Sequence, residues 1–192
     1  MTAGERRMRW TLLWVLVCCA PACREGSMED DGGASDPQLF IASPASFHGF
    51  TTWASFAFDA PATPDGLTHV AGHRVVFLNH RPPHGATSFS VGTVIVKEIF
   101  PTDAADANGA KTFAMAKRGG NYNSSGAAGW EWFELDPPQS INPDMPSIVW
   151  RGVAPPAGEN YGGSSGGTCN DCHSAARAND FVQSPPLQLA DL

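Results

Sequence analysis

The chain has 192 residues, of which 42% are hydrophobic, and its formal net charge at pH 7 is −7. An acidic chain without a block of Lys or Arg argues against nucleic acid and against anionic lipid surfaces as partners. After an N-terminal export signal, residues 38–192 have the length of one domain.

The first residues predict export. Three arginines before residue 10 precede an apolar run at residues 10–19, and small residues follow up to Ala22. This order is that of a signal peptide, which we place at residues 1–22. The apolar run is shorter than the roughly 20 residues of a membrane-spanning helix. Cleavage after Ala22 would leave Cys23 first, as in bacterial lipoproteins, and would anchor the protein in the periplasm or cell envelope. A freely soluble exported protein is the alternative.

Residues 23–37 are polar, acidic and rich in Gly. Such a composition predicts a flexible tether between the anchor and a folded domain at residues 38–192. We therefore expect contact with a membrane only through the lipid at Cys23.

The domain is predicted to be mainly β, in the α+β class, with an antiparallel sheet of about five strands and few short helices. Short runs of β-branched and aromatic residues alternate with turn clusters, and the connections are too short for parallel crossovers. The predicted strands are His73–Leu78, Ser90–Phe100, Lys111–Arg118, Trp130–Leu135 and Ser147–Arg151, and the predicted helices are Pro44–Phe58 and Asn170–Asn179.

The most informative motif is Cys169-Asn170-Asp171-Cys172-His173. Cys-x-x-Cys-His is the signature of haem c attachment, in which both thiols form thioethers and the His ligates the iron. Redox pairs, zinc sites and disulfides also use Cys-x-x-Cys. Here the pair follows the Gly/Ser run 162–167, and residues 38–192 hold no second Cys pair. One covalent haem c per chain, at a C-terminal attachment segment, is the expected cofactor.

The residue opposite His173 on the iron is a separate question. The 19 residues after His173 contain no Met, His, Cys or Lys, so a downstream sixth ligand is missing. Met115 alternates with Phe113 and Lys117, which favours a place in the sheet core. An open distal site for a small molecule is therefore expected. An electron carrier with Met115 as sixth ligand remains an alternative.

In order along the chain, four further segments resemble motifs of the cytochrome P-460 family: Gly92–Glu98, Ala114–Arg118, Trp130–Trp132 and, after the Cys-x-x-Cys-His motif, Asp180–Val182. The resemblance covers about Gly72 to Val182. It implies an exported, largely antiparallel β protein that often forms a homodimer and holds one haem c through a proximal His. It also implies redox chemistry on hydroxylamine or nitric oxide with a redox partner protein.

In hydroxylamine-oxidising members of this family, the Lys of the Gly-Thr-x-x-Val-Lys motif is linked covalently to the porphyrin edge. The resemblance assigns this role to Lys97. Alternation in the predicted strand places Lys97 on one face with Ile95 and Ile99, where an ammonium is costly and its pKa falls. An outward Lys beside Glu98 on an edge strand is the alternative.

One position departs from the hydroxylamine-oxidising pattern. Those relatives have a carboxylate over the distal iron, and an ungapped match places Phe113 there. An apolar Phe113 resembles the distal pockets of cytochromes c′-beta, which bind gases, whereas Glu131 or Glu134 could supply a carboxylate from the next strand. The sequence thus predicts either an oxidoreductase for hydroxylamine or nitric oxide or a gas-binding cytochrome without turnover.

Overall fold

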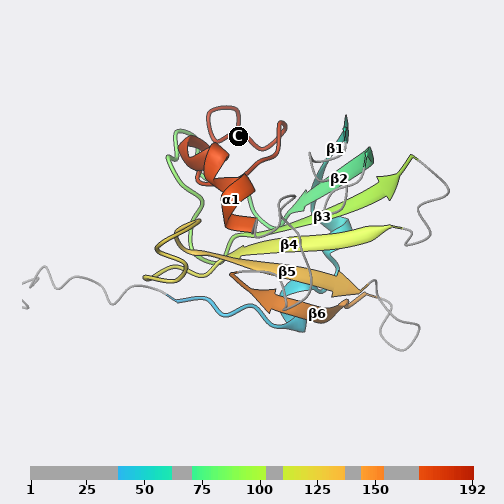
Figure 1. Cartoon of the computed structure of the whole chain (residues 1–192), viewed down its shortest axis with the longest axis horizontal. Coiled ribbons are helices and arrows are strands. Elements are labelled where there is room, and N and C mark those ends of the chain that lie inside the picture. Colours follow the sequence, from blue (N-terminus) through green and yellow to red (C-terminus); the bar gives the residue numbers. More distant parts are fainter. Residues whose placement is uncertain (1–38, 62–70, 103–109, 137–143, 154–168) are drawn as a thin grey trace, which may run out of the picture. The chain divides into compact units, whose positions relative to one another are not determined.

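In this computed structural model, each strand pairs with the strand before it in the chain. The described residues form one antiparallel sheet of six strands in the order β1-β2-β3-β4-β5-β6 (Figure 1). The structure describes residues 39–61, 71–102, 110–136, 144–153 and 169–192. The strands are β1 (Ala54–Ala60), β2 (Gly72–Leu78), β3 (Val94–Pro101), β4 (Lys111–Lys117), β5 (Trp130–Asp136) and β6 (Ser147–Gly152).

The predicted mainly β, antiparallel fold is confirmed, with six strands instead of about five. All five predicted strands are present, with ends that differ by at most one residue, except that the strand predicted from Ser90 begins at Val94. Near the C-terminus, the predicted helix at Asn170–Asn179 is divided into α1 (Cys169–His173) and the 3-10 helix η3 (Ser174–Asn179).

The predicted helix at Pro44–Phe58 is wrong over most of its length. Two short 3-10 helices occupy its first part, η1 (Pro44–Phe47) and η2 (Phe50–Thr52), and β1 follows directly. Gly49 separates the two turns with a φ of +63°, a conformation that favours Gly. The strand forms because Phe56 and Phe58 are partly buried in alternation with exposed neighbours, which is the period of a strand.

One face of the sheet is covered by the N-terminal segment with η1 and η2. Phe47 and Phe50 are fully or almost fully buried there. Their rings meet Phe133 and Phe77 edge-on, each at a centroid distance of 5.2 Å. This aromatic layer closes one side of the sheet and leaves the other side for the C-terminal segment.

The opposite face carries α1 and the residues that follow it (Figure 1). Trp130 and Trp132 on β5 pack in one apolar cluster with Phe181, Val182 and Leu187 of the C-terminal segment. Successive residues of β5 therefore contribute alternately to two separate cores, one on each face of the sheet.

A buried ion-pair cluster joins β5, β6 and the N-terminal segment on the face of η1. Glu131 is 2% exposed and accepts hydrogen bonds from Nε and Nη2 of Arg151, at 2.8 and 2.9 Å, and from Arg118 at 3.2 Å. Nη1 of Arg151 also donates to the carbonyl of Ala42 at 2.8 Å. Glu131 is therefore committed to this cluster and lies on the face away from α1.

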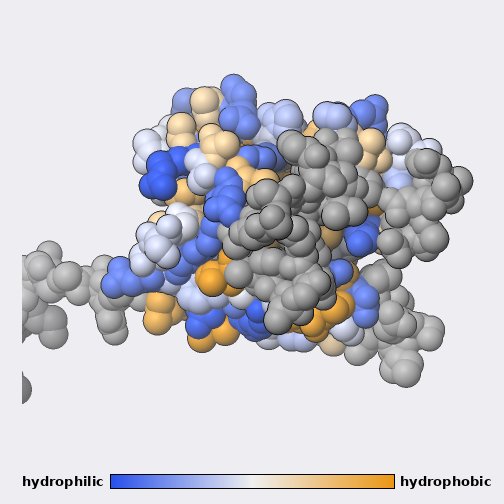
Figure 2. Space-filling view, viewed as in Figure 1, coloured by the Kyte–Doolittle hydropathy of each residue, from blue (hydrophilic) through white to orange (hydrophobic). Residues whose placement is uncertain are grey.

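The predicted signal peptide, Cys23 and the predicted tether lie outside the described residues. All described residues belong to one compact unit, Ser35–Leu192. Hydrophilic residues dominate its visible described surface, and hydrophobic ones gather at the side of β6 and the N-terminal segment (Figure 2). Among the helices that the structure describes, none combines the length and the apolar character needed to cross a membrane.

The Glu131 cluster gives a stability prediction. Glu131→Gln should lower the free energy of unfolding by about 2 kcal/mol, because Arg118 and Arg151 lose a charged hydrogen-bond partner. Chemical denaturation monitored by Trp fluorescence measures this loss. The control Asp136→Asn, at the exposed end of the same strand, should change stability by less than about 0.5 kcal/mol. Equal stability of both variants would contradict the assigned role of Glu131.

Candidate haem-attachment site

The helix α1, which carries Cys169, Cys172 and His173, has no buried residue of its own. Side-chain hydrogen bonds hold it on the sheet instead. Oδ1 of Asn170 accepts from Nε1 of Trp132 at 3.1 Å and from the backbone N–H of Ala127 at 3.2 Å. The amides of Asn170 and Asn123 also pair with each other, at 2.8 and 2.9 Å. Asn170, a variable position of the motif, is thus the first anchor of α1.

The loop that receives Asn170 has no space for a side chain at Gly126. A Cβ at Gly126 would overlap the side-chain amide of Asn170. Asn123 has a left-handed backbone, with a φ of +52°, and its amide also donates to the carbonyl of Trp130 at 3.0 Å. The loop after β4 is therefore shaped to take up the side chain of Asn170.

The second anchor lies beyond η3, at Asp180. Its carboxylate accepts from Nζ of Lys117 at 2.7 and 2.9 Å and from the backbone N–H of Phe89 at 2.9 Å. Its carbonyl accepts from Nε1 of Trp130 at 2.8 Å. Asp180 and Phe181 both have left-handed backbones, with φ of +48° and +66°. The Asp-x-Val segment that resembled a family motif is therefore a tight turn fixed to β4 and β5.

His173 is oriented by this turn. Its Nδ1 lies 2.7 Å from the carbonyl of Phe181. A carbonyl only accepts, so Nδ1 carries the proton and Nε2 is left with its lone pair. Within the described part of the chain, no hydrogen-bond partner meets Nε2. The ring of Trp132 packs beside the imidazole at a centroid distance of 4.4 Å.

The imidazole of His173 is held neutral. Burial, and to a smaller extent the positive charge of Lys97, lower the pKa of His173 to about 4, although the hydrogen bond to Phe181 opposes the shift. A neutral imidazole with a lone pair on Nε2 is the form that ligates a metal ion.

Lys97 lies on β3, between β2 and β4, and not on an edge strand. Burial lowers its pKa to about 7, and the positive charge of Arg74 acts in the same direction. Cys169 and Cys172 act in the opposite direction. Lys97 alternates with Ile95, and Cys169 packs against the apolar cluster that contains Ile95. Lys97 therefore lies on the face of the sheet that α1 covers, near enough to Cys169, Cys172 and His173 for electrostatic effects between them.

Cys169 and Cys172 form no disulfide within the described part of the chain and are partly buried. Burial is the main cause that raises the pKa of Cys169 to about 11. Cys169 also packs against the apolar cluster on the α1 face of the sheet. Cys169 is therefore protonated at neutral pH and lies at the border between core and solvent.

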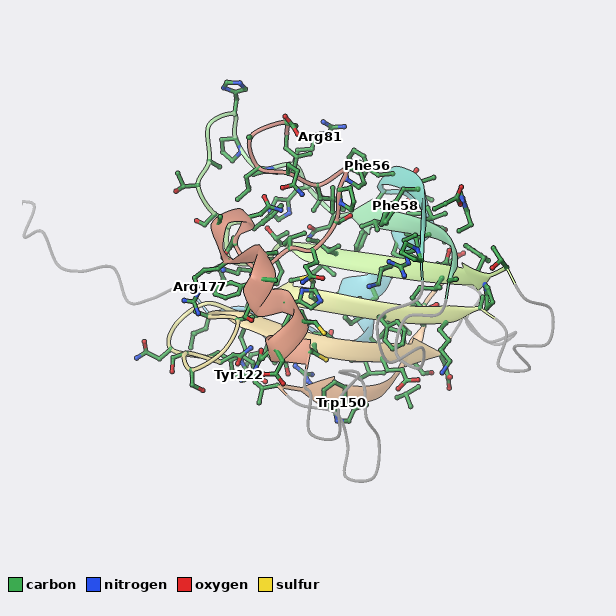
Figure 3. All side chains as sticks on the ribbon, turned by 45° about the horizontal axis from the view of Figure 1, so that its top comes forward. Phe56, Phe58, Arg81, Tyr122, Trp150 and Arg177 are labelled. Carbon is green, nitrogen blue, oxygen red and sulfur yellow. The ribbon has the colours of Figure 1, made fainter. Side chains whose placement is uncertain are left out.

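Lys97 belongs to a row of side chains that crosses the whole sheet. In the antiparallel register it lies opposite Phe113 on β4, and Phe113 lies opposite Glu134 on β5. Residues directly opposite each other on neighbouring strands have Cβ atoms about 5 Å apart. The row ends in Phe56 on β1 and Trp150 on β6, at the two edges of the sheet (Figure 3).

The register separates the two carboxylates that could serve near the iron. Glu134 shares a face with Lys97 and Phe113, whereas Glu131 points to the other face and is bound by two arginines. The interpretation of Glu131 as a distal carboxylate is therefore wrong, and Glu134 is the carboxylate on the side of α1.

Met115 is 6% exposed and lies opposite Ile95 and Trp132 in the register. Its predicted place in the sheet core is confirmed. Within the described residues, no group of three or more His, Cys, Asp or Glu side chains is placed to hold a bare metal ion.

Several residues of the site were not assigned a role from the sequence. Arg74 contributes a positive charge beside Lys97, Asn170 anchors α1, and Lys117 binds Asp180. Alternation could have placed Arg74 on the face of Lys97, because it precedes Val76 by two residues on a predicted strand. The contacts of Asn170 and Lys117 join segments far apart in the sequence and have no local signal.

Comparison with known proteins finds no protein family model, no curated protein and no solved structure that matches this chain.

The buried position of Lys97 predicts that the folding stability of the chain depends on pH. Between pH 7 and its ordinary pKa of 10.5, the unfolded chain binds more protons at Lys97 than the folded chain does. The stability of the haem-free chain should therefore rise with pH across this range. Lys97→Met should remove this contribution to the rise, which denaturation midpoints at several pH values would reveal.

The matched control is Lys111→Met, at the first residue of the neighbouring strand β4. It leaves Lys97 in place and should keep the pH dependence of the wild type. The same dependence in Lys97→Met and Lys111→Met would show that Lys97 titrates as in the unfolded chain.

Proposed function

We propose that this chain is an exported, mono-haem c-type cytochrome of the P-460 type that acts as an oxidoreductase on hydroxylamine or nitric oxide. The observation that carries the proposal is the meeting of Lys97 with Cys169, Cys172 and His173 on one face of the sheet. The proposal includes a redox partner protein, a homodimer and a lipid anchor at Cys23 as expectations from the sequence and the resemblance.

The residues fit a covalent haem. Two free thiols on one helical turn provide the thioether positions, and Nε2 of His173 is directed by the bond of Nδ1 to Phe181. When bound, haem c would supply an iron that changes between the ferric and ferrous states and can hold a small ligand, with His173 as its protein ligand.

Lys97 has the properties needed for a bond to the porphyrin edge. With a pKa of about 7, a large part of its amine is neutral and nucleophilic at neutral pH. Such a bond would replace a porphyrin C–H bond and one N–H bond of Lys97 by a C–N bond, with the loss of two electrons and two protons. Hydrogen peroxide would accept these electrons and protons and become two molecules of water.

Phe113 and Glu134 support two different activities. Glu134, opposite Phe113 on the same face, is the candidate to accept protons from a bound hydroxylamine. Phe113, between Lys97 and Glu134, presents a partly buried aromatic ring where a small apolar gas would bind. A gas-binding cytochrome that takes up nitric oxide without turnover is therefore the second candidate function.

Optical spectra of the ferric and ferrous protein, with hydroxylamine and an artificial electron acceptor, test the proposal. A broad, red-shifted ferrous band with turnover is expected. Lys97→Ala should keep haem attached through Cys169 and Cys172 but lose the red-shifted band, whereas Lys111→Ala should keep it. An ordinary haem c spectrum in the wild type, equal to that of Lys97→Ala, would contradict the crosslink. Nitric oxide binding without turnover would favour the second function.

The role of Glu134 has its own test. Glu134→Gln should lower the rate of hydroxylamine oxidation by about 100-fold or more, since a positioned base contributes factors of this order. Glu98→Gln is the control, because Glu98 lies next to Lys97 in β3 but points to the opposite face. Steady-state rates that fall equally in both variants, or in neither, would exclude Glu134 as the proton acceptor.

A further inference from the structure

The hydrogen bond of His173 depends on an unusual piece of backbone. Phe181, whose carbonyl accepts from Nδ1, has a φ of +66°, and Asp180 before it has a φ of +48°. Left-handed backbone is tolerated by Asp but is unfavourable for an aromatic residue. Two such residues in succession persist only where surrounding contacts impose them.

The contacts that impose this turn come from three other segments and converge on Asp180. Lys117 at the end of β4 holds both carboxylate oxygens, at 2.7 and 2.9 Å, and the side chains of the pair are only 12% and 9% exposed. Phe89 donates its backbone N–H to the same carboxylate, and Trp130 donates its indole N–H to the carbonyl.

Lys117 is itself fixed in place. Its Nζ also donates to the carbonyl of Ala128 at 3.1 Å and lies 5.0 Å from the ring centroid of Trp130. An ammonium held by a carbonyl, an aromatic face and a carboxylate has little freedom to leave Asp180. The position of the turn is thus determined from β4 and β5.

We propose that Lys117 and Asp180 are positioning residues for His173. Their ion pair fixes the turn so that the carbonyl of Phe181 receives the Nδ1 proton, which sets the ring orientation and leaves Nε2 for the iron. This inference rests on the proposed function, because it concerns His173 as the haem ligand.

The bond has an electronic consequence as well as a geometric one. A carbonyl that accepts from Nδ1 makes the imidazole a stronger donor at Nε2. A stronger donor stabilises ferric over ferrous iron and strengthens the iron–His bond. The Lys117–Asp180 pair therefore acts on the redox potential of the iron without touching it.

The test uses the full-length, haem-loaded protein and the variant Asp180→Asn. Asn keeps the shape and the tolerance for left-handed backbone, and its oxygen can still accept from Phe89, but the charge that holds Lys117 is lost. We expect a lower iron–His stretching frequency in ferrous resonance Raman spectra. We also expect a shift toward ferrous iron of about tenfold, or about 59 mV upward in midpoint potential for a one-electron couple.

Matched variants of Lys117 separate positioning from a general loss of stability. Lys117→Met should change the iron–His frequency and the midpoint potential in the same way as Asp180→Asn does. Lys117→Arg keeps an ion pair and should give values near those of the wild type. Lys111→Met removes the same charge at the other end of β4 and should change neither quantity. The double variant Lys117→Met/Asp180→Asn leaves no unpaired charge and gives the same test if a single variant does not fold.

The outcomes distinguish this inference from the proposed function. Haem-loaded variants with wild-type Raman frequency and potential, even if less stable, would overturn the positioning role and leave the proposed function standing. A wild-type protein without covalent haem would overturn the proposed function itself.

Discussion

The helix α1 has no fully buried residue, and hydrogen bonds of Asn170 on one side and Asp180 on the other fix it against the sheet. Both sets end on the indole N–H groups of neighbouring tryptophans of β5, Trp132 and Trp130. A short helix of five residues has little stability of its own, and without these bonds it would not remain ordered. The position of the Cys-x-x-Cys-His segment is therefore a property of β5 and its loops.

Placing α1 on this face determines the electrostatics of the site. Lys97 lies in the middle of the sheet, and burial disfavours charge on Lys97, Cys169 and His173. The positive charge of Lys97 disfavours the protonated form of His173. The face thus carries a neutral imidazole, a protonated thiol and an amine with a lowered pKa. These properties underlie the proposed haem function.

Much of the sheet could be predicted from the sequence, because its central strands have strong alternation and are separated by turn residues. The strand β1 was missed because its aromatic residues follow a Pro-initiated turn and were assigned to one helix. The two glutamates of β5 show a different limit. Alternation places Glu131 and Glu134 on opposite faces, but only the packing of η1 and α1 shows which face holds the site.

The two anchors of α1 could not be predicted, since Asn123 and Asn170 are 47 residues apart and Lys117 and Asp180 are 63 residues apart. Neither pair has a periodic or compositional signal. The chemistry-bearing residues Lys97, Cys169, Cys172 and His173 were identified by local motifs, whereas the contacts that bring them together are long-range.

The central claim is that Cys169 and Cys172 hold one haem covalently. Intact mass spectrometry of the denatured protein, produced with export and cytochrome maturation, tests it most directly. The account predicts that the processed chain gains the mass of one haem and that Cys169→Ser/Cys172→Ser loses this gain. A wild-type mass equal to the polypeptide alone would contradict the account.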